Sequence, residues 1–555
     1  MIPAPAGAAR NISDVAADER CPASKGTPNH NPEMISQIFK RHPVLKSMLL
    51  SFSSACLLVL AFPQTDIGIL SWVALVPLFF SIDGKKPLAS FLIGYFSGVI
   101  FFFGTLYWFI YVTVLGAALL VLYLALYFGL FTLGYAYAAG QRPVYKIVLL
   151  PSLWVALEYA RAHLFTGFGW ASLGYSQYRN LLLIQIADVT GMYGVSFLLV
   201  MANYALKEFL GEKISRAKNI GRDSKPVVIV LACLIAVVLG YGAFQLSQVR
   251  ESPQVSVVAV QGNVPQEVKW DRMAWPLIME RYLSLTEQAA AEGPDIIIWP
   301  ETAFPGFLWE SADLWGQLDA FVVEMKTPLL VGVVTREAGA YFNSALLIPA
   351  RGGIAGQYHK LHLVPFGEYV PLRGKFPFLT DIIPIDDFTP GREHTLFGVG
   401  ERENGIGEKG FFSVLICFED GVAEISREFV RRGANFLVNI TNDAWFGDTK
   451  APFMHLQSSV FRAVENRRSL IRAANTGVSC SIDPRGRIVG FVENARGKKT
   501  FVPGYVLDGG VQLSREKTLY TKFGDFFTYL CFGCILHWIV SRAISVFYRS
   551  RGRAG

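Results

Sequence analysis

Three residues in the hydrophilic part of the chain have the chemistry of a thiolate enzyme. Cys417 lies in the run FFSVLICFED, Glu301 in DIIIWPETAFPG and Lys360 in GQYHKLHLVPFGEYVP. A cysteine reacts as a thiolate, and a thiol with a pKa of about 8.5 needs a base and a cation to form one. Glu301 could act as the general base, and Lys360 could supply the cation and later stabilise an oxyanion.

The local sequence places two of these residues at strand ends. Cys417 follows the apolar run SVLI, and Glu301 follows IIIWP. A sheet delivers catalytic groups into a crevice at such positions. The neighbouring Glu419 and Asp420 would oppose thiolate formation, so the base and the cation must come from elsewhere. Taken singly, Cys417 could be a buried strand cysteine, Glu301 a loop acid and Lys360 a solvated lysine.

The elements that must position these residues lie in a block at about 251–522. β-rich runs recur there, namely VSVVAV, DIIIWP, PLLVGVV, FNSALLI, FFSVLICF and NFLVNIT. Helical patterns are expected between several of them, over 275–292, 314–325, 422–432 and 455–468. This alternation predicts a layered α/β domain, and the nearly continuous apolar character of the strands predicts cover on both faces.

The rest of the chain has the composition of a membrane protein. Hydrophobic residues make up 52% of the 555 residues and charged residues 17%, against about 25% charged in a soluble domain. A spanning helix needs about 20 apolar residues. Eight spans are predicted, at 46–62, 67–82, 88–111, 116–139, 147–163, 190–206, 227–246 and 526–547. The first two are short, and the turn joining them could instead form one re-entrant hairpin.

The distribution of Lys and Arg predicts the orientation of these spans. Basic residues are found in alternate loops, at 85–86, 142–146 and 207–225, and in the C-terminal tail. Basic loops stay on the cytoplasmic side, which explains the net charge of +7 without nucleic acid. Residues 44–250 are therefore a seven-span domain, 251–522 an external, periplasmic domain, and 523–555 a last span with a cytoplasmic tail. Residues 1–43 have no apolar run, and we expect a disordered N-terminal extension.

Several motifs resemble a known superfamily. WPETAFPG, YHKLHLVPFGEYVP and ICFED, in that order, are similar to the carbon–nitrogen hydrolase (nitrilase) superfamily, whose Glu–Lys–Cys triad falls on Glu301, Lys360 and Cys417. The resemblance implies an αββα sandwich. Together with the predicted spans, the motifs VQGNVPQEVKW, NITNDAWFG, HLQSSVFRAVENRR and IRAANTGVS resemble the apolipoprotein N-acyltransferase family of the bacterial inner membrane.

The resemblance implies a ping-pong reaction by a monomeric enzyme without a metal or cofactor. Cys417 would take an acyl chain from a phospholipid, typically phosphatidylethanolamine, as a thioester. The N-terminal amine of a diacylglyceryl apolipoprotein would then attack the thioester. Glu301 would accept the thiol proton and later the amine proton, and Lys360 would hold the oxyanions together with a backbone N–H near Phe418.

The resemblance also implies roles for five further positions. Trp270 matches a functional tryptophan, Glu368 an acid that orients the triad lysine, and Glu419 the acid two residues past the nucleophile. Phe418 stands where the family commonly has tyrosine, which leaves a packing or backbone role. Trp445 resembles a tryptophan on a mobile arm near the site.

Two other functions remain open from the sequence alone. A membrane-anchored amidase would use the same triad with water as the acceptor, although one span would be enough to anchor it. A transporter would need ion-handling residues at the bilayer midplane, and the spans contain few. The apolar stretch 375–385 could dip into the interface as a lid or pack as an ordinary loop.

Overall fold

The computed structural model describes residues 42–216, 224–248, 251–370, 373, 387–401 and 408–551. Nearly all of the expected N-terminal extension lies outside these residues, as does the apolar stretch 375–385. Residues from Ser47 onward form one compact unit, which contains both the helical region and the α/β domain.

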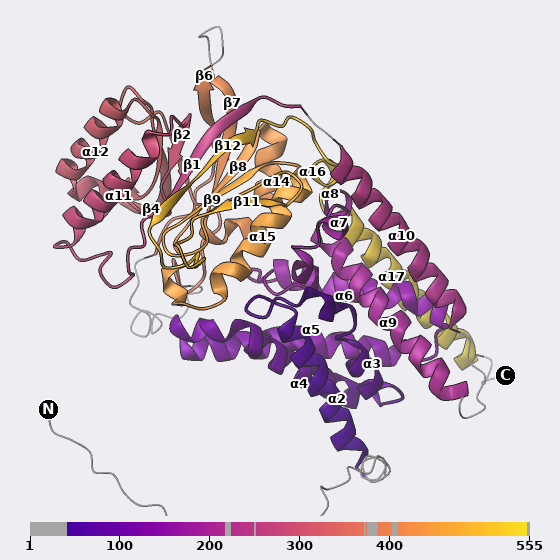
Figure 1. Cartoon of the computed structure of the whole chain (residues 1–555). Helices are drawn as coiled ribbons and strands as arrows, with labels where there is room; N and C mark the ends of the chain where they lie inside the picture. The colour runs from indigo at the N-terminus through magenta and orange to yellow at the C-terminus, as the bar shows by residue number, and fades with distance from the viewer. Residues whose placement is uncertain are drawn as a thin grey trace, which may run out of the picture. The chain divides into compact units, whose positions relative to one another are not determined.

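Seven long helices make up the helical region (Figure 1). They are α2 (Pro43–Leu60), α4 (Pro87–Leu106), α5 (Val114–Tyr137), α6 (Pro143–His163), α9 (Met192–Arg216), α10 (Lys225–Ser247) and α17 (Phe526–Arg551). The predicted span at 67–82 is not one helix. It comprises a 3-10 turn, η1 (Gly68–Trp72), and a seven-residue helix, α3 (Val76–Ile82), which is only about 10 Å long.

Among the described residues, five helices are long and apolar enough to cross a membrane. They are Pro43–Leu60, Pro87–Tyr111, Val114–Tyr137, Lys225–Ser247 and Phe526–Ser545. Helices α6 and α9 are long enough but contain several ionisable residues, and the expected number of eight spans is therefore not confirmed. In α6, Glu158 accepts a hydrogen bond from the backbone of Leu173, and Arg161 donates to the carbonyl of Trp170. These ionisable groups therefore hold the polypeptide that follows α6.

The charged ends of several helices meet at one end of the helical region. Lys207 of α9 lies 3.0 Å from Oδ2 of Asp83, and Oδ1 of Asp83 accepts from the hydroxyl of Tyr135 on α5. Arg542 of α17 donates to the carbonyl of Tyr137. The loops after α3 and α5 therefore lie beside the middle of α9 and the last turns of α17.

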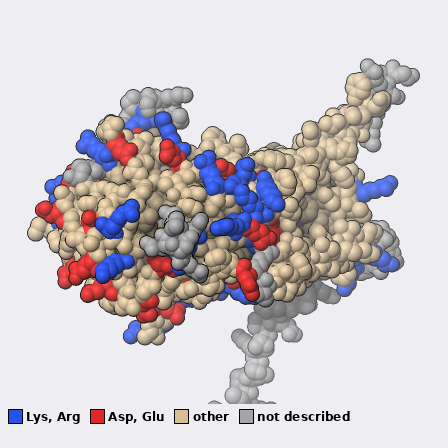
Figure 2. Space-filling model, turned by 90° about the horizontal axis from the view of Figure 1, so that it is seen from above, with Lys and Arg blue, Asp and Glu red and all other residues tan. Residues whose placement is uncertain are grey.

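The opposite end of the helical region contacts the α/β domain. Lys450 donates to the carbonyl of Gly104, at the end of α4, over 2.7 Å. Arg467 forms an ion pair of 2.7 Å with Asp188, in the short helix α8 (Ala187–Thr190). In Figure 2, Lys, Arg, Asp and Glu side chains crowd one part of the visible surface, whereas the remainder is largely uncharged.

The α/β domain contains two six-stranded sheets. The first has the order β12 (Gly504–Gln512), β1 (Gln254–Gln261), β2 (Ile296–Ile298), β3 (Leu329–Glu337), β4 (Ala340–Ile348) and β5 (Gly356–His359). The second has the order β11 (Ile488–Phe491), β10 (Cys480–Ile482), β9 (Leu470–Ala474), β8 (Phe436–Thr441), β7 (Glu408–Ile416) and β6 (Phe397–Glu401). In each sheet three central strands are parallel and the outer strands antiparallel.

Alternate residues of the strands explain the four layers. Val257 and Ala259 of β1 share one core with the second sheet. Their neighbours Val258 and Val260 share another with α11 (Trp275–Ala290) and α12 (Ala312–Met325). Helices α14 (Ala423–Arg432) and α15 (Ala451–Asn466) cover the outer face of the second sheet (Figure 1). The predicted αββα sandwich is therefore confirmed.

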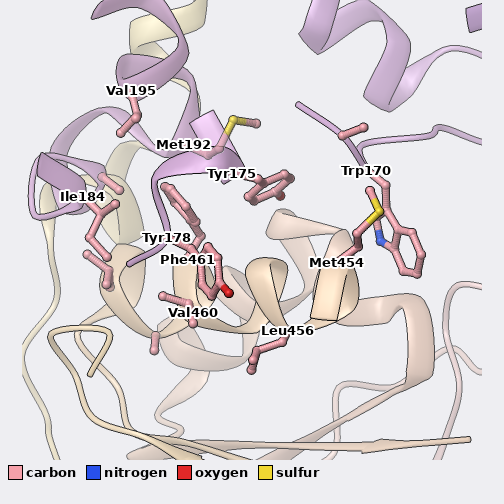
Figure 3. Close-up of a cluster of buried hydrophobic side chains, with 14 of the residues drawn as sticks. Trp170, Tyr175, Tyr178, Ile184, Met192, Val195, Met454, Leu456, Val460 and Phe461 are labelled. Carbon is pink, nitrogen blue, oxygen red and sulfur yellow. The ribbon is translucent and has the colours of Figure 1, made fainter. Parts of the chain in front are cut away.

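Helix α15 couples the sandwich to the helical region. Every residue of α15 but one is buried, as expected for a helix that packs against a sheet on one side and other helices on the other. Met454, Val460 and Phe461 of α15 face Trp170 and Tyr175 of the helical region (Figure 3). The rings of Tyr175 and Phe461 are 5.2 Å apart. The sandwich thus packs on the helical region through apolar and aromatic side chains of α15.

Candidate active site

Cys417 lies in a strained turn directly after β7. The strand ends at Ile416, and Cys417 opens a 3-10 turn that extends to Gly421. Its φ of 54° is in the left-handed region, which is unfavourable for a residue with a side chain. The expectation that Cys417 follows a strand is confirmed, and the sharp turn lifts its thiol out of the sheet.

Lys360 directly follows β5 and is held between two carboxylates. Its ammonium group lies 2.8 Å from Glu368 and 3.7 Å from Glu301, and its side chain is only 1% exposed. Burial opposes the charged form, but the two carboxylates and the Cys417 thiol raise the pKa of Lys360 above its usual value. The site therefore contains a permanent cation.

Glu301 is fixed by donors from both sheets. One carboxylate oxygen accepts from the side-chain amide of Asn343 in β4, and the other from the backbone N–H of Asn442 after β8, each over 2.8 Å. The same Asn343 nitrogen donates to Glu368 over 2.8 Å. Asn343 therefore sets the spacing of the two carboxylates around Lys360, a role that the sequence did not indicate.

The electrostatic surroundings of Cys417 favour the neutral thiol. Burial and the carboxylate of Glu301 raise the pKa of Cys417, and Lys360 lowers it only in part. The thiol therefore needs a base at the moment of attack. Glu301 is the carboxylate that raises the pKa of Cys417 most, and Asp443 adds to this effect.

Glu419 ties the lysine segment to the cysteine turn. Its buried carboxylate accepts from the backbone N–H groups of Leu361, His362 and Ile416, over 2.6, 3.1 and 2.7 Å, and from the hydroxyl of Tyr358 over 2.9 Å. Burial raises the pKa of Glu419 to about 7, although these donors oppose the rise. The residue acts as a structural clamp between β5 and β7.

The three aromatic positions implied by the resemblance lie in different surroundings. The ring of Phe418 packs 5.5 Å from Trp170 and 6.4 Å from Phe168, both in the helical region. Trp270 is 42% exposed and lies 5.7 Å from the ring of Phe307. Trp445 is 52% exposed, in the turn that precedes α15. Only Phe418 is therefore packed into the interface beside the nucleophile.

A second lysine lies beside Glu301. Lys269, adjacent to Trp270 in the sequence, donates to the hydroxyl of Thr302 over 2.5 Å and to the backbone carbonyl of Glu301 over 3.3 Å. Burial lowers the pKa of Lys269 to about 8, although Glu301 and Cys417 act in the other direction. The sequence pattern VKW was noted only for its tryptophan, so this second cation was missed.

A buried ionic network holds the backbone of the turn at Cys417–Gly421. Nε2 of His455 lies 3.1 Å from the carbonyl oxygen of Cys417, and the amide nitrogen of Asn439 donates to the same oxygen over 3.0 Å. His455 also pairs with Asp420 and Asp443, over 2.9 and 3.0 Å. Burial disfavours its charge, but both carboxylates raise the pKa of His455 to about 9.

Arg472 completes this network. Its guanidinium lies 3.3 Å from Asp420 and 3.0 Å from Asp443, and all three side chains are fully buried. Polar residues of this network interrupt otherwise apolar runs, namely Asp420 in FED, Asn439 in NIT, His455 in MHLQ and Arg472 in IRAAN. Their positions in buried elements were the signal that could have revealed the network.

Comparison with known proteins agrees with this architecture. Residues 54–205 match the apolipoprotein N-acyltransferase N-terminal domain, and residues 256–516 match the carbon-nitrogen hydrolase family. The apolipoprotein N-acyltransferase of Geobacter metallireducens is 39% identical, over 88% of this chain and 93% of its own. That of Chlorobaculum tepidum is 32% identical, over 88% of this chain and 94% of its own.

A solved amidase from Nesterenkonia sp. overlaps 51% of this chain and 97% of its own, at 17% identity and a TM-score of 0.36. The two full-length relatives, by contrast, span the helical region and the sandwich together. The chain belongs to the apolipoprotein N-acyltransferase family, within the carbon–nitrogen hydrolase superfamily.

Proposed function

We propose that this enzyme matures lipoproteins by a ping-pong transfer through a thioester on Cys417. The acyl donor is a membrane phospholipid, and the acceptor is the N-terminal amine of a diacylglyceryl apolipoprotein. The observation that carries this proposal is the convergence of Lys360, Glu301 and the Cys417 turn in one buried site. That site lies where the sandwich meets the helical region, and the relatives share both parts.

In the first half-reaction Glu301 accepts the proton of the Cys417 thiol. The thiolate attacks the ester carbonyl of the phospholipid, and the carbonyl oxygen becomes an oxyanion. Lys360 and a backbone N–H near Phe418 stabilise this charge. Collapse of the intermediate breaks the carbon–oxygen ester bond, and the lysophospholipid leaves as an alcohol with the proton from Glu301.

In the second half-reaction the amine of the apolipoprotein attacks the thioester carbonyl. The same donors hold the second oxyanion, and Glu301 accepts a proton from the attacking nitrogen. Breakage of the carbon–sulfur bond yields the amide and the thiolate, which recovers its proton from Glu301. Cys417 and Glu301 thus return to their starting protonation states.

We further propose that the enzyme lies in the inner membrane with its sandwich on the periplasmic side. The cluster around Lys207 and Asp83 supports this orientation, because it lies at the end of the helical region opposite the sandwich. A site at the bilayer surface also avoids the cost of about 0.8 kcal/mol for each CH₂ group drawn into water. Phosphatidylethanolamine as the donor and a monomeric enzyme are supported by the family resemblance.

Intact-protein mass spectrometry after incubation with phospholipid vesicles tests the proposal. We expect one acyl chain on Cys417, released by hydroxylamine, and its loss on addition of an apolipoprotein peptide with appearance of the triacylated product. Glu301→Gln should form little adduct, and Cys417→Ser should form no hydroxylamine-sensitive adduct. Wild-type enzyme that never carries an acyl chain on Cys417 would disprove the thioester route.

The amidase alternative predicts a different result in the same experiment. An enzyme that hydrolyses a small amide would form no acyl adduct on Cys417 from phospholipid and would yield no triacylated product. Product analysis by chromatography therefore separates the two functions.

A further inference from the structure

A cavity of about 710 Å³ lies beside the proposed catalytic site. Its walls come from the loop after α6, the start of α9, the segment after β5, helices α14 and α15, and the residues before α17. It reaches Phe418, next to Cys417, and Leu361, next to Lys360. Its volume is typical of a ligand site, for which about 300–1,000 Å³ is common.

The polar lining of this cavity is acidic. Four carboxylates line it, those of Asp387, Glu424, Glu465 and Asp525, and Arg462 is the one Lys or Arg among the lining residues that the structure describes. His163 pairs with Glu424 over 2.5 Å and would add one positive charge. Burial and the charge of Lys360 lower the pKa of His362, the other imidazole of the lining. Carboxylates therefore outnumber cations.

Three ionisable groups that line the cavity come from different parts of the fold. The nearest ligand atoms of His163, Glu424 and Asp525 all lie within 4.8 Å of one another. His163 ends α6, Glu424 begins α14, and Asp525 immediately precedes α17. Outside the wall, Arg427 lies close enough to act on Asp525, and Arg373 pairs with Asp387 over 3.2 Å.

One buried carboxylate oxygen of this wall lacks a donor. Oε1 of Glu465 accepts from Arg462 over 2.8 Å and from the backbone of Met192 over 3.0 Å. Oε2 of Glu465 has no hydrogen-bond partner within the part of the chain that the structure describes, although the side chain is 1% exposed. An unsatisfied buried acceptor is costly, and Glu465 is among the residues that line the cavity, so a ligand whose N–H donors reach this oxygen would satisfy it.

We propose that this cavity binds the protonated primary amine of a substrate, with Asp525, Glu424 and Glu465 as acceptors. An ammonium group has three N–H donors and one positive charge, which matches a wall of carboxylates. The inference rests on the proposed function and deepens it. Both proposed substrates carry such an amine, the phospholipid in its ethanolamine head group and the apolipoprotein at its N-terminus.

Single-turnover kinetics of Asp525→Asn and Glu424→Gln test this site. The rate of Cys417 acylation is measured with phosphatidylethanolamine vesicles and, separately, with p-nitrophenyl palmitate, which acylates the thiol without an amine. We expect the ratio of the first rate to the second to fall about 10-fold, the loss expected for one hydrogen bond between charged groups. Glu428→Gln is the matched control, because Glu428 lies on the same helix and pairs with Arg431 and Arg432 at the surface.

A second measurement identifies the source of the amine. Enzyme acylated beforehand is mixed with diacylglyceryl apolipoprotein peptide, and the rate of transfer is followed. If the acylation rate with phosphatidylethanolamine falls relative to that with p-nitrophenyl palmitate, the cavity binds the phospholipid head group. If this ratio is unchanged but the rate of acyl transfer to the peptide falls about 10-fold, the cavity binds the acceptor amine.

The inference is overturned if both variants keep the wild-type ratio of acylation rates and the wild-type transfer rate, or if they slow both acylation reactions and the transfer step by the same factor. Wild-type enzyme that is acylated by p-nitrophenyl palmitate but never by phospholipid would instead contradict the proposed function itself.

Discussion

Nε2 of His455 lies 3.1 Å from the carbonyl oxygen of Cys417. The carbonyl belongs to a residue with a φ of 54°, a backbone conformation that its surroundings must maintain. Asp443 and Asp420 in turn hold the imidazole ring, so the turn that begins at Cys417 is anchored to a fully buried ionic network. His455 is therefore a positioning residue that acts on the reaction through the backbone of Cys417.

Replacement of His455 by glutamine should lower kcat much more than it changes KM. The variant loses the imidazolium between Asp420 and Asp443, and breaking a buried ion pair costs about 3–5 kcal/mol of stability. The rate of Cys417 acylation and the thermal unfolding temperature are measured together. A variant as stable as the wild type that also acylates at the wild-type rate would contradict this role. His394→Gln, on a partly exposed imidazole of the same domain, is the matched control.

Stability should depend on pH because His455 has a raised pKa in the folded protein. Its unfolded value is about 6.5, and in the folded state it is about 9. The folded state therefore binds this proton more tightly. The contribution of His455 is fully present below about pH 6.5 and is lost as the pH rises through 9. The difference in unfolding temperature between the wild type and His455→Gln should shrink from pH 6 to pH 9.5, and a constant difference would refute it.

Lys269 should assist the first half-reaction as a second cation near the thiolate. Replacement by methionine keeps the length of the side chain but removes its charge from beside Glu301 and Cys417. We expect acylation to slow about 10-fold or more, because one charged interaction in a buried site contributes roughly that amount. Stopped-flow acylation measures the rate, with Lys409→Met as the control on a half-exposed lysine paired with Asp295. An unchanged rate for Lys269→Met would show that Lys360 alone provides the positive charge.

The sandwich could be predicted because its strands have a simple pattern. The central strands are largely covered on both faces, so VSVVAV and FFSVLICF read as short apolar runs, and the helices between them have an amphipathic period. Cys417 at the end of its strand followed from the same pattern. Asn343 could not be found in this way. It donates to both Glu301 and Glu368 only because the register of β4 brings its side chain between their carboxylates.

The helical region was harder to predict because hydrophobicity does not distinguish a span from a buried helix. The run at 67–82 is apolar, yet it contains only a seven-residue helix, Val76–Ile82, with Pro77 in its first turn, and this helix packs inside the protein. Helix α6 is long and largely apolar, but its buried Glu158 and Arg161 bond to the backbone of Leu173 and Trp170 in the segment that follows the helix. Such tertiary partners cannot be read from a local window.

Phe418 should act by packing, so the variants Phe418→Ala and Phe418→Tyr should behave differently. Alanine removes the ring that contacts Trp170 and Phe168, which loosens the cysteine turn against the helical region. Large-to-small changes at packed aromatic positions cost about 3–5 kcal/mol when the ring is fully buried, and we expect a smaller loss for this half-buried ring. Tyrosine keeps the ring and should retain acylation activity.

Thermal unfolding and single-turnover acylation of both variants distinguish packing from hydroxyl chemistry. We expect Phe418→Ala to lower both the unfolding temperature and the acylation rate, and Phe418→Tyr to stay close to the wild type in both. A large rise in acylation rate for Phe418→Tyr at unchanged stability would show that the hydroxyl takes part in the reaction. In that case the reaction could use a tyrosine hydroxyl that Phe418 lacks, and packing alone would not describe this position.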